Sequence, residues 1–204
     1  MARRTKDEAE KTRNAILDAA EKVFYKQGVA RTTLEQIARN ANVTRGAVYW
    51  HFRDKSELCD AMWERVFLPQ EDVLEQLAAG TSEKPLEELR TACAESLKLM
   101  ATDKRRNRVV SILMLRCEYT EDMEGIMERR RECKGRMLDR CQRMFERAHK
   151  LKMLNPDWTP RLAAIHLQAL MSGLILSGIE GRKGFDLVRI GPACIEAFFR
   201  SVTA

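Results

Sequence analysis

The chain has 204 residues, a length that suits one domain or a small domain joined to a larger one. Hydrophobic residues make up 45% of it and charged residues 32%, a balance that excludes an intrinsically disordered chain. It has only 5 Pro and 10 Gly, no run of alternating β-branched residues, and many helix-forming residues such as Ala, Leu, Glu and Arg, so the composition predicts an all-α fold.

The net charge of +6 is concentrated near the N-terminus. Residues 1–55 hold 12 Lys and Arg against 7 Asp and Glu, whereas the remaining 149 residues hold 24 against 23. A basic segment of this kind indicates either phosphate binding or a generic basic surface, and charge alone does not separate the two.

The six cysteines form no CxxC pair and the three histidines are scattered, so the sequence predicts neither a metal site nor a bound cofactor. Free thiols in a reducing compartment are the simplest interpretation. A redox-sensing pair, formed by Cys133 and Cys141 or between subunits, is the alternative. No nucleophile, base and orienting group occur at a spacing that suits catalysis, and no phosphate-binding loop is present, so an enzyme is not expected.

The first residues are charged and contain no apolar segment, so no signal peptide is predicted and a cytoplasmic location is expected. Residues 162–179 carry no formal charge, but polar side chains interrupt them and a bilayer needs roughly 20 apolar residues. We interpret this segment as a buried helix, placed in a subunit interface, and expect no membrane association.

Residues 32–58 predict two short helices joined by a tight turn, followed by the start of a third helix. Thr33 and Gln36 have the spacing of a capping box, and Thr44 is placed to cap the second helix. Asn42, in the turn, tolerates a positive φ angle. This layout is typical of a DNA-binding helix-turn-helix, whose second helix enters the major groove.

Most of the candidate DNA-binding residues lie on or beside the second helix, and Thr33 lies at the start of the first. Arg45 has the forked donors that read guanine O6 and N7, and Gly46 allows the backbone to approach the groove closely. The hydroxyl groups, ring donors and ammonium group nearby suit phosphate oxygens. One of the neighbouring aromatics, Tyr49 or Trp50, is expected to face the core. The predicted set is Thr33, Thr44, Arg45, Gly46, Ala47, Tyr49, Trp50, His51 and Lys55.

Further helices are predicted on both sides of this motif. A helix over residues 7–27 ends at Gly28, a residue that favours helix termination. After the motif, a long helix is expected from Asp54, and the others are predicted at residues 85–100, 103–119, 121–151, 160–179 and 187–202. This organisation predicts a helix-turn-helix domain over residues 1–55 and a larger helical domain over residues 56–204, which share a continuous helix.

The segment ILDAAEKVFYKQGVARTTLEQIARNANVTRGAVYWHFRDKSEL, residues 16–58, resembles the N-terminal domain of the tetracycline-repressor (TetR) family of bacterial regulators. The opening ARRTKDEAEKTR, RCEYTEDM at residues 116–123 and GFDL at residues 184–187 are similar to the AcrR branch, the local repressors of multidrug efflux pumps. The resemblance is close over about the first 65 residues and patchy afterwards.

Two departures from the family pattern stand out. Asn42 occupies a position where the family usually has Gly, which the turn accommodates. Residues 172–178 lack the acidic residue and the aromatics that relatives of this branch tend to carry. This departure puts in doubt whether the chain keeps the ligand contacts that such relatives make there.

The resemblance implies a homodimer with a ligand cavity in each C-terminal domain. A small-molecule inducer, drug-like or apolar, would bind in this cavity. Aligned with the family, the cavity would be lined by Val66, Phe67, Gln70, Leu89, Cys93, Ser96, Val110, Leu113, Met114, Met137, Cys141, Gln168, Met171 and Ser172.

A row of small side chains at every fourth position of helix 160–179 is compatible with such a dimer, because it lets two helix backbones approach closely. Two residues of the last helix complete the surface. Close packing within one subunit is the alternative. The predicted dimer interface is Ala169, Gly173, Ser177, Gly181, Ile195 and Phe198.

We therefore expect a homodimeric repressor that binds a pseudo-palindromic, double-stranded operator. By resemblance it controls a multidrug efflux pump operon and is released by small apolar or cationic compounds. The alternatives are a redox-responsive or metabolite-responsive regulator of the same fold, and a DNA-binding protein whose C-terminal domain is purely structural.

Overall fold

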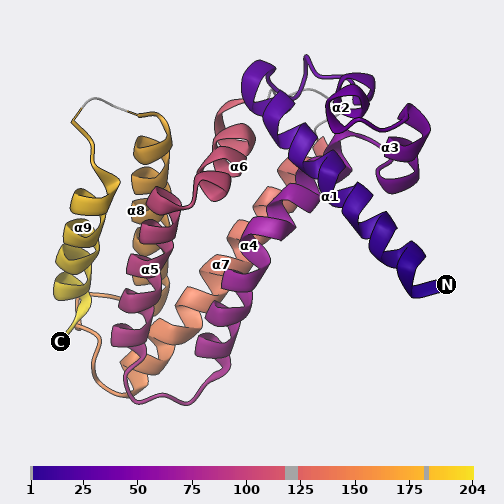
Figure 1. Ribbon diagram of the computed structural model, residues 1–204. Helices are drawn as coiled ribbons and strands as arrows, with labels where there is room; N and C mark the ends of the chain where they lie inside the picture. The colour runs from indigo at the N-terminus through magenta and orange to yellow at the C-terminus, as the bar shows by residue number, and fades with distance from the viewer. Residues whose placement is uncertain (1, 118–123, 182–183) are drawn as a thin grey trace. The chain divides into compact units, whose positions relative to one another are not determined.

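The computed structural model describes residues 2–117, 124–181 and 184–204, and regular structure in these residues is helical (Figure 1). An isolated antiparallel bridge joins Leu154 to Thr203. The predicted all-α fold is confirmed. In chain order the helices are α1 (Ala2–Gln27), α2 (Leu34–Ala41), α3 (Arg45–His51), α4 (Lys55–Ala79), α5 (Pro85–Thr102), α6 (Lys104–Leu115), α7 (Glu124–Lys150), α8 (Pro160–Ile179) and α9 (Leu187–Val202).

The chain packs into two compact units. The N-terminal unit contains Met1–Val66 and Arg108–Arg129, and the C-terminal unit contains Phe67–Asn107 and Arg130–Ala204. The division falls within α4, α6 and α7, so each of these helices belongs partly to both units. The division by function predicted above, into residues 1–55 and 56–204, is a separate matter and stays a prediction.

The core of the N-terminal unit is built on α1, which packs against α2 and α3. Ile16, Ala20 and Phe24 follow one another at intervals of four residues and are completely buried, as expected for one face of a helix. The helix stops at Gly28, where φ is 85° and the N–H donates to the carbonyl of Phe24 at 2.9 Å. The predicted helix end is confirmed.

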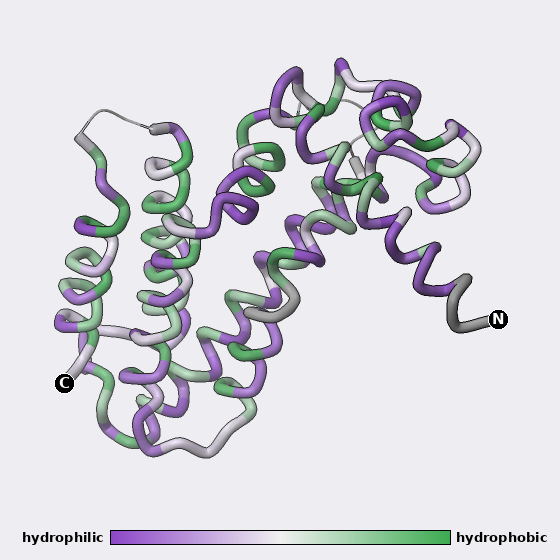
Figure 2. The backbone as a smooth tube through the Cα atoms, viewed as in Figure 1, coloured by the Kyte–Doolittle hydropathy of each residue, from purple (hydrophilic) through white to green (hydrophobic). Residues whose placement is uncertain are grey.

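The C-terminal unit contains α5, α8 and α9 packed together. Figure 2 shows hydrophobic and hydrophilic residues alternating along α5 and α9, as in amphipathic helices with one buried face, whereas α8 is mostly hydrophobic. Two glycines permit the close packing. A Cβ atom at Gly191 would lie 3.0 Å from Leu97 Cδ1, and one at Gly178 would lie 2.9 Å from Leu187 Cδ2. A side chain at either position would force the neighbouring leucine to shift.

Local capping fixes the ends of α8 and α9 where the sequence predicts them. The Thr159 hydroxyl accepts from the N–H of Leu162, and Pro160 fills the first helical position, where the missing N–H costs nothing. The Asp186 carboxylate accepts from the N–H groups of Val188 and Arg189.

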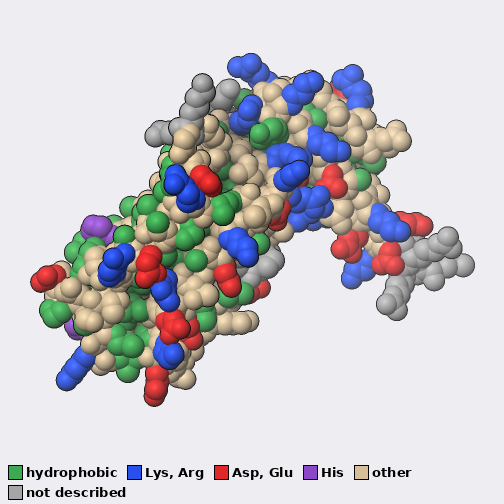
Figure 3. Space-filling view, turned by 60° about the vertical axis from the view of Figure 1, so that its left-hand side comes forward, with side chains coloured by type: hydrophobic (Ala, Val, Ile, Leu, Met, Phe, Trp, Pro, Cys, Tyr) green, Lys and Arg blue, Asp and Glu red, His purple; other side chains and the backbone are tan. Residues whose placement is uncertain are grey.

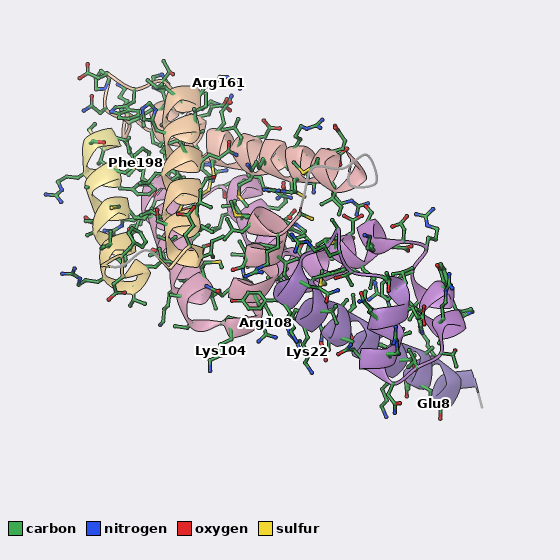
Figure 4. The ribbon with its side chains drawn as sticks, turned by 90° about the horizontal axis from the view of Figure 1, so that it is seen from above. Glu8, Lys22, Lys104, Arg108, Arg161 and Phe198 are labelled. Atoms are coloured by element: carbon green, nitrogen blue, oxygen red, sulfur yellow. The ribbon has the colours of Figure 1, made fainter. Side chains whose placement is uncertain are left out.

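An aromatic cluster closes one end of the C-terminal unit. The Phe198 ring lies edge-on to Trp158 and Phe145, with centroid distances of 5.8 and 6.3 Å, and Phe199 stacks on Phe145 at 6.4 Å. Figure 4 labels Phe198 on α9. Such pairs add specific geometry to the burial of apolar surface.

Helix α8 is long and apolar enough to cross a membrane by length and composition alone, and 22% of its most apolar window is buried. The low burial within one chain is compatible with the predicted place in a subunit interface, which stays a prediction. Leu162 and Ile165 remain 41% and 43% exposed on its outer side. Exposed apolar residues on one side of a helix are typical of a surface that a partner covers.

Candidate DNA-binding and ligand-binding sites

The first helix of the predicted motif, α2, begins at a complete capping box. The Thr33 hydroxyl accepts from the Gln36 N–H at 3.2 Å, and Gln36 Oε1 accepts from the Thr33 N–H at 2.9 Å. Gln27 of α1 donates its Nε2 to Gln36 Oε1 at 3.0 Å. These bonds confirm the predicted start of the helix and tie it to α1.

The turn depends on a left-handed residue, as the sequence indicates. Asn42 has φ 54° and ψ 43°, a conformation that Asn adopts more readily than most other residues. Its N–H donates to the Arg39 carbonyl, and the N–H of Val43 donates to the Ala38 carbonyl at 3.0 Å. The last carbonyls of α2 are thereby satisfied, and the chain reverses directly into α3.

Helix α3 is short, and its placement depends on one cap and two buried anchors. The Thr44 hydroxyl accepts from the Ala47 N–H at 3.1 Å. Val48 and Phe52, four residues apart, are 0% and 1% exposed. Because an α-helix turns by about 100° per residue, these two residues occupy the inward side and leave the opposite side to solvent.

Both aromatic residues between the anchors are exposed, so the expectation that one of them faces the core is wrong. Tyr49 is 46% exposed and Trp50 is 74% exposed. Val48 and Phe52 already fill the inward side, and Trp50 lies about half a turn from Val48. The Trp50 indole contacts the His51 ring edge-on at 4.5 Å. An exposed tryptophan of this size contributes little to the fold.

The remaining predicted residues share the accessible side of α3. Thr44, Arg45 and Gly46 are exposed, whereas Ala47 and His51 are half-buried. Burial, reinforced by the positive charge of Arg13, lowers the pKa of His51. The imidazole is therefore neutral at pH 7 and can donate one N–H to a phosphate.

Neither packing nor backbone geometry within the unit requires a glycine at position 46. A Cβ atom there would meet the Thr44 hydroxyl at 3.9 Å, an ordinary contact distance. A glycine inside a helix weakens it relative to alanine. The structure therefore supplies no internal reason for this glycine, whereas close approach to an external surface would supply one.

Lys55, predicted to hold a phosphate, is engaged within the unit. Its Nζ donates to the carbonyls of Val29 and Ala30 at 3.0 and 3.1 Å. An ammonium group has three donors, so one N–H remains for a further partner. The structure thus shows Lys55 fastening the loop after α1 to the start of α4, and its phosphate contact stays a prediction.

Basic side chains surround this motif. Figure 3 shows Lys and Arg side chains gathered over the visible face of the N-terminal unit. Arg13 lies over the Phe52 ring at 5.2 Å, and Arg39 and Arg53 form exposed pairs with Glu35 and Glu57. Exposed pairs of this kind exchange readily with water and leave the guanidinium groups accessible.

The predicted ligand-binding residues are divided between the two units. Val66, Val110, Leu113 and Met114 belong to the N-terminal unit, and the others belong to the C-terminal unit. Leu89, Cys93 and Cys141 are buried in the latter. The side chain of Gln70 lies outside those that the structure describes.

Some members of this set have definite neighbours. Arg106 lies over the Phe67 ring at 5.2 Å, and Gln168 donates its Nε2 to the Lys134 carbonyl at 2.7 Å. Cys93 and Cys141, from α5 and α7, lie near one another; burial, with a smaller contribution from the Cys141 thiol, raises the pKa of Cys93. The cavity itself stays a prediction.

A polar depression in the N-terminal unit lies elsewhere and does not suit an apolar ligand. Ion pairs cross it, from Arg129 to Asp60 at 3.3 Å and to Glu64 at 3.4 Å. None of the predicted ligand-binding residues borders it. Its lining is Arg13, Arg53, Asp54, Ser56, Glu57, Asp60, Ala61, Glu64 and Arg129.

The predicted dimer surface needs one correction. Ala169 and Gly173 are exposed, and a Cβ atom at Gly173 would meet nothing within 4 Å, so these two residues do not pack closely within their own subunit. Ile195, however, is 1% exposed and lies in the core between α9 and its neighbours. It cannot contribute to a surface between subunits in this conformation.

Sequence reasoning missed the larger apolar residues on this side of the unit. Leu162 and Ile165 share one side of α8 with Ala169 and Gly173, and Val188 of α9 is 57% exposed. Their spacing of three to four residues on α8 was the available signal. Ser177 and Phe198 are half-buried, and Gly181 is exposed.

The redox pair proposed within one chain is wrong. Cys133 and Cys141 both lie on α7, eight residues apart, which places their Cα atoms about 12 Å from each other. A disulfide requires Cα atoms within about 7 Å. Both thiols are buried, and burial raises the pKa of Cys141 to about 11, which suppresses the reactive thiolate. A disulfide between subunits stays untested.

The sequence matches known families over both units. Residues 16–62 match the bacterial regulatory proteins of the tetR family, and residues 84–203 match the C-terminal region of MAATS-type transcriptional repressors. The chain belongs to the TetR family of bacterial regulatory proteins. The predicted family is confirmed, and the first match encloses α2, the turn and α3. Members of the TetR family are transcriptional regulators.

Individual TetR-family relatives match over nearly the whole chain. The HTH-type transcriptional repressor BepR of Brucella suis biovar 1 (strain 1330) is 38% identical over 202 residues, which is 99% of this chain and 97% of BepR. The crystal structure of NalD, the secondary repressor of the MexAB-OprM multidrug efflux pump in Pseudomonas aeruginosa, has a TM-score of 0.88 and 39% identity, and covers 97% of this chain and 98% of NalD.

A ligand complex is among the similar structures. SmeT of Stenotrophomonas maltophilia, in complex with triclosan, has a TM-score of 0.87 and 35% identity to this chain. The match covers 95% of this chain and 92% of SmeT.

Proposed function

We propose that this protein is a homodimeric, ligand-responsive repressor that controls a multidrug efflux pump operon and its own gene. The observation that carries the proposal is that α3 is anchored on one side and exposed on the other. Val48 and Phe52 are buried in the core and anchor the helix, whereas Arg45, Tyr49 and Trp50 are exposed to solvent. A helix that is capped, anchored and left with polar and aromatic groups exposed suits insertion into a major groove.

In the proposal, as the sequence indicates, some residues contact the bases and others contact the phosphates. Arg45 reads a guanine, and Gly46 allows the backbone to come close to the bases. Thr33, Thr44 and His51 donate to phosphates, and Lys55 uses its remaining N–H in the same way. Two copies of α3, one from each subunit, would enter major grooves about 34 Å apart on a pseudo-palindromic operator.

Dimerisation is proposed through the outer side of α8 and α9. Leu162, Ile165, Ala169 and Gly173 present an apolar strip on α8, and Val188 is an exposed apolar residue on α9 that the proposal adds to it. Apolar residues on one exposed side of a helix are typical of a surface that a partner covers. Phe198, Ser177 and Gly181 border this strip in the proposal.

The C-terminal part is proposed to hold the inducer, in the division that assigns residues 1–55 to DNA and residues 56–204 to ligand and partner subunit. The relatives support this role, because NalD is a repressor of an efflux pump and SmeT forms a complex with triclosan. A ligand releases the repressor only if it binds the DNA-incompetent conformation more tightly than the competent one. The protein is expected in the bacterial cytoplasm, bound to DNA, without a cofactor and without catalytic activity.

Fluorescence anisotropy with labelled DNA tests the proposal. The fragment upstream of the protein's own gene is titrated at low and physiological salt, beside a scrambled fragment of equal length, with Arg45→Ala as the matched variant. We expect a dissociation constant of about 10⁻⁸ M or lower for the native fragment and binding at least roughly 10³-fold weaker to the scrambled one. Equal, strongly salt-dependent binding to both fragments would contradict the proposal.

The same titration, combined with a thermal-shift assay, separates the alternatives. Triclosan is the first compound to add, followed by a panel of lipophilic and cationic drugs. Release by some of them supports the efflux-pump assignment. Specific binding that no drug releases would point to a metabolite or an oxidant as the signal, and specific binding with no thermal shift by any compound would favour a structural C-terminal domain.

A further inference from the structure

The two longest polar side chains on the exposed side of α3 contact each other. Arg45 Nη2 donates to the Tyr49 hydroxyl at 3.2 Å, and Arg45 Cζ lies 5.3 Å from the centroid of the Tyr49 ring. The two residues are four positions apart, which places their side chains on the same side of the helix. The guanidinium group is therefore held by a hydrogen bond and by the face of an aromatic ring.

This arrangement is not explained by helix stability. Arg45 is the first residue of α3, and a positive charge at a helix N-terminus opposes the helix dipole. Both side chains are exposed, and exposed contacts between neighbouring turns contribute little to folding. Glu35, an acidic residue whose charge acts on Arg45, pairs with Arg39 at 3.7 Å.

A tyrosine partner differs from an acidic partner in one respect that matters for recognition. A carboxylate would neutralise the guanidinium charge and compete with guanine for its donors. The tyrosine hydroxyl accepts one N–H, and the ring attracts the charge without cancelling it. Four of the five N–H donors of Arg45 remain, enough for a bidentate contact with guanine O6 and N7.

We propose that Tyr49 is a positioning residue that holds Arg45 in the conformation that reads a base, and that it contributes to operator specificity through Arg45. The inference rests on the proposed function and changes the role given to Tyr49, which the sequence assigned to phosphate binding. Ordering the arginine before DNA arrives removes part of the entropy cost of binding, which is the usual benefit of pre-organisation.

The positioning role and the phosphate role predict different effects of Tyr49→Phe, which removes only the hydroxyl. If Tyr49 positions Arg45, the variant loses affinity for the operator and loses discrimination at the base pair that Arg45 reads. If Tyr49 binds a phosphate, the variant weakens binding to all sequences alike. The same base pair must be the one at which Arg45→Ala loses discrimination.

A double-mutant cycle on the operator, with each G·C pair substituted in turn, tests the proposal. We expect Arg45→Ala to weaken operator binding by about 5- to 150-fold and Tyr49→Phe by about 3- to 10-fold. The double variant should be no weaker than Arg45→Ala alone within about twofold, because the hydroxyl has no other role to lose. Trp50→Phe, which changes an exposed side chain of α3 outside the Arg45–Tyr49 hydrogen bond, should be additive with Arg45→Ala.

Two outcomes are distinguishable from each other. Specific wild-type binding combined with additive effects of Arg45→Ala and Tyr49→Phe, or with a uniform loss across operator variants, would overturn the positioning role alone. Absence of specific binding by the wild-type protein would overturn the proposed function and the positioning role together. Unchanged circular dichroism and thermal midpoints confirm that the variants fold, as expected for two exposed side chains.

Discussion

The Glu21 carboxylate of α1 accepts a hydrogen bond from the Arg108 guanidinium of α6 at 2.9 Å, although only 4% of the Glu21 side chain is exposed. Arg108 and Arg116 also lie over the Tyr25 ring, at 5.9 and 5.0 Å, and the Val29 N–H donates to the Arg116 carbonyl at 3.1 Å. Figure 4, where Arg108 and Lys22 are labelled, shows α6 beside α1. These contacts join the helix that precedes the helix-turn-helix to a segment about 90 residues later in the chain.

Removing Arg108 should destabilise the N-terminal unit. Arg108→Ala leaves the Glu21 carboxylate buried without its charged partner, and breaking a fully buried pair costs about 3–5 kcal/mol. Because the Arg108 side chain is 35% exposed and water can replace part of the contact, we expect a loss of about 2 kcal/mol in the free energy of unfolding. Urea titration measures it. Lys104→Ala, an exposed change on the same helix, should cost less than about 0.5 kcal/mol, and equal effects of the two variants would refute the prediction.

Two substitutions of Gly46 should separate its effect on the stability of α3 from its effect on DNA binding. Gly46→Ala stabilises α3 by about 0.5–1 kcal/mol, because alanine is the better helix former and the fold has space for its Cβ atom. Gly46→Leu should weaken operator binding at least about tenfold, because its side chain would separate the backbone from the groove. Thermal unfolding and anisotropy measure the two effects. Retained operator affinity in Gly46→Leu would show that the backbone does not approach the DNA here.

The outer side of α8 should be required for dimerisation. Ile165→Glu places a charge in the proposed apolar strip, so it should shift the protein to monomers in analytical ultracentrifugation without loss of helical content. Val73→Glu changes an equally exposed apolar residue, 50% exposed on α4, and should leave the dimer intact. A dimer that survives Ile165→Glu and Ala169→Glu would place the interface elsewhere.

His51 should make stability depend on pH. Burial and the neighbouring charge of Arg13 lower its folded pKa below the value of about 6.5 in unfolded chains. The unfolded state therefore binds more protons, and the contribution to stability is present above about pH 6.5 and declines as the pH falls through the folded pKa. Urea midpoints between pH 5 and 7 measure this decline. His51→Gln should flatten it, and an unchanged pH profile in that variant would assign the dependence to another group.

Features with local causes were predictable from the sequence. Thr159 and Pro160 fix the start of α8, Asp186 fixes the start of α9, and Asn42 fixes the turn before α3, because each acts on backbone groups within three residues. The observed bounds of α8 and α9 equal the predicted ranges for this reason. α1 begins earlier than predicted, at Ala2, because its charged first turns carry no apolar periodicity.

Features that depend on contacts distant in sequence were not predictable. The pairing of Glu21 with Arg108 and the burial of Ile195 follow from which helices pack together, and the hydrophobic period of one helix does not encode its neighbour. The exposure of both Tyr49 and Trp50 follows from Val48 and Phe52 already filling the core beneath α3. Two aromatic residues on a seven-residue helix are expected to contribute to the core unless other residues are known to fill it.

Reciprocal coupling between operator and ligand tests the central claim most directly. The affinity for the labelled operator is measured with and without saturating triclosan or the most effective drug of the panel, and the affinity for that compound is measured with and without operator. A ligand-responsive repressor must show the same factor in both directions, here expected to be about tenfold or more. Operator affinity that does not change at saturating concentrations of every compound that binds would show equal binding to both conformations and would contradict the account.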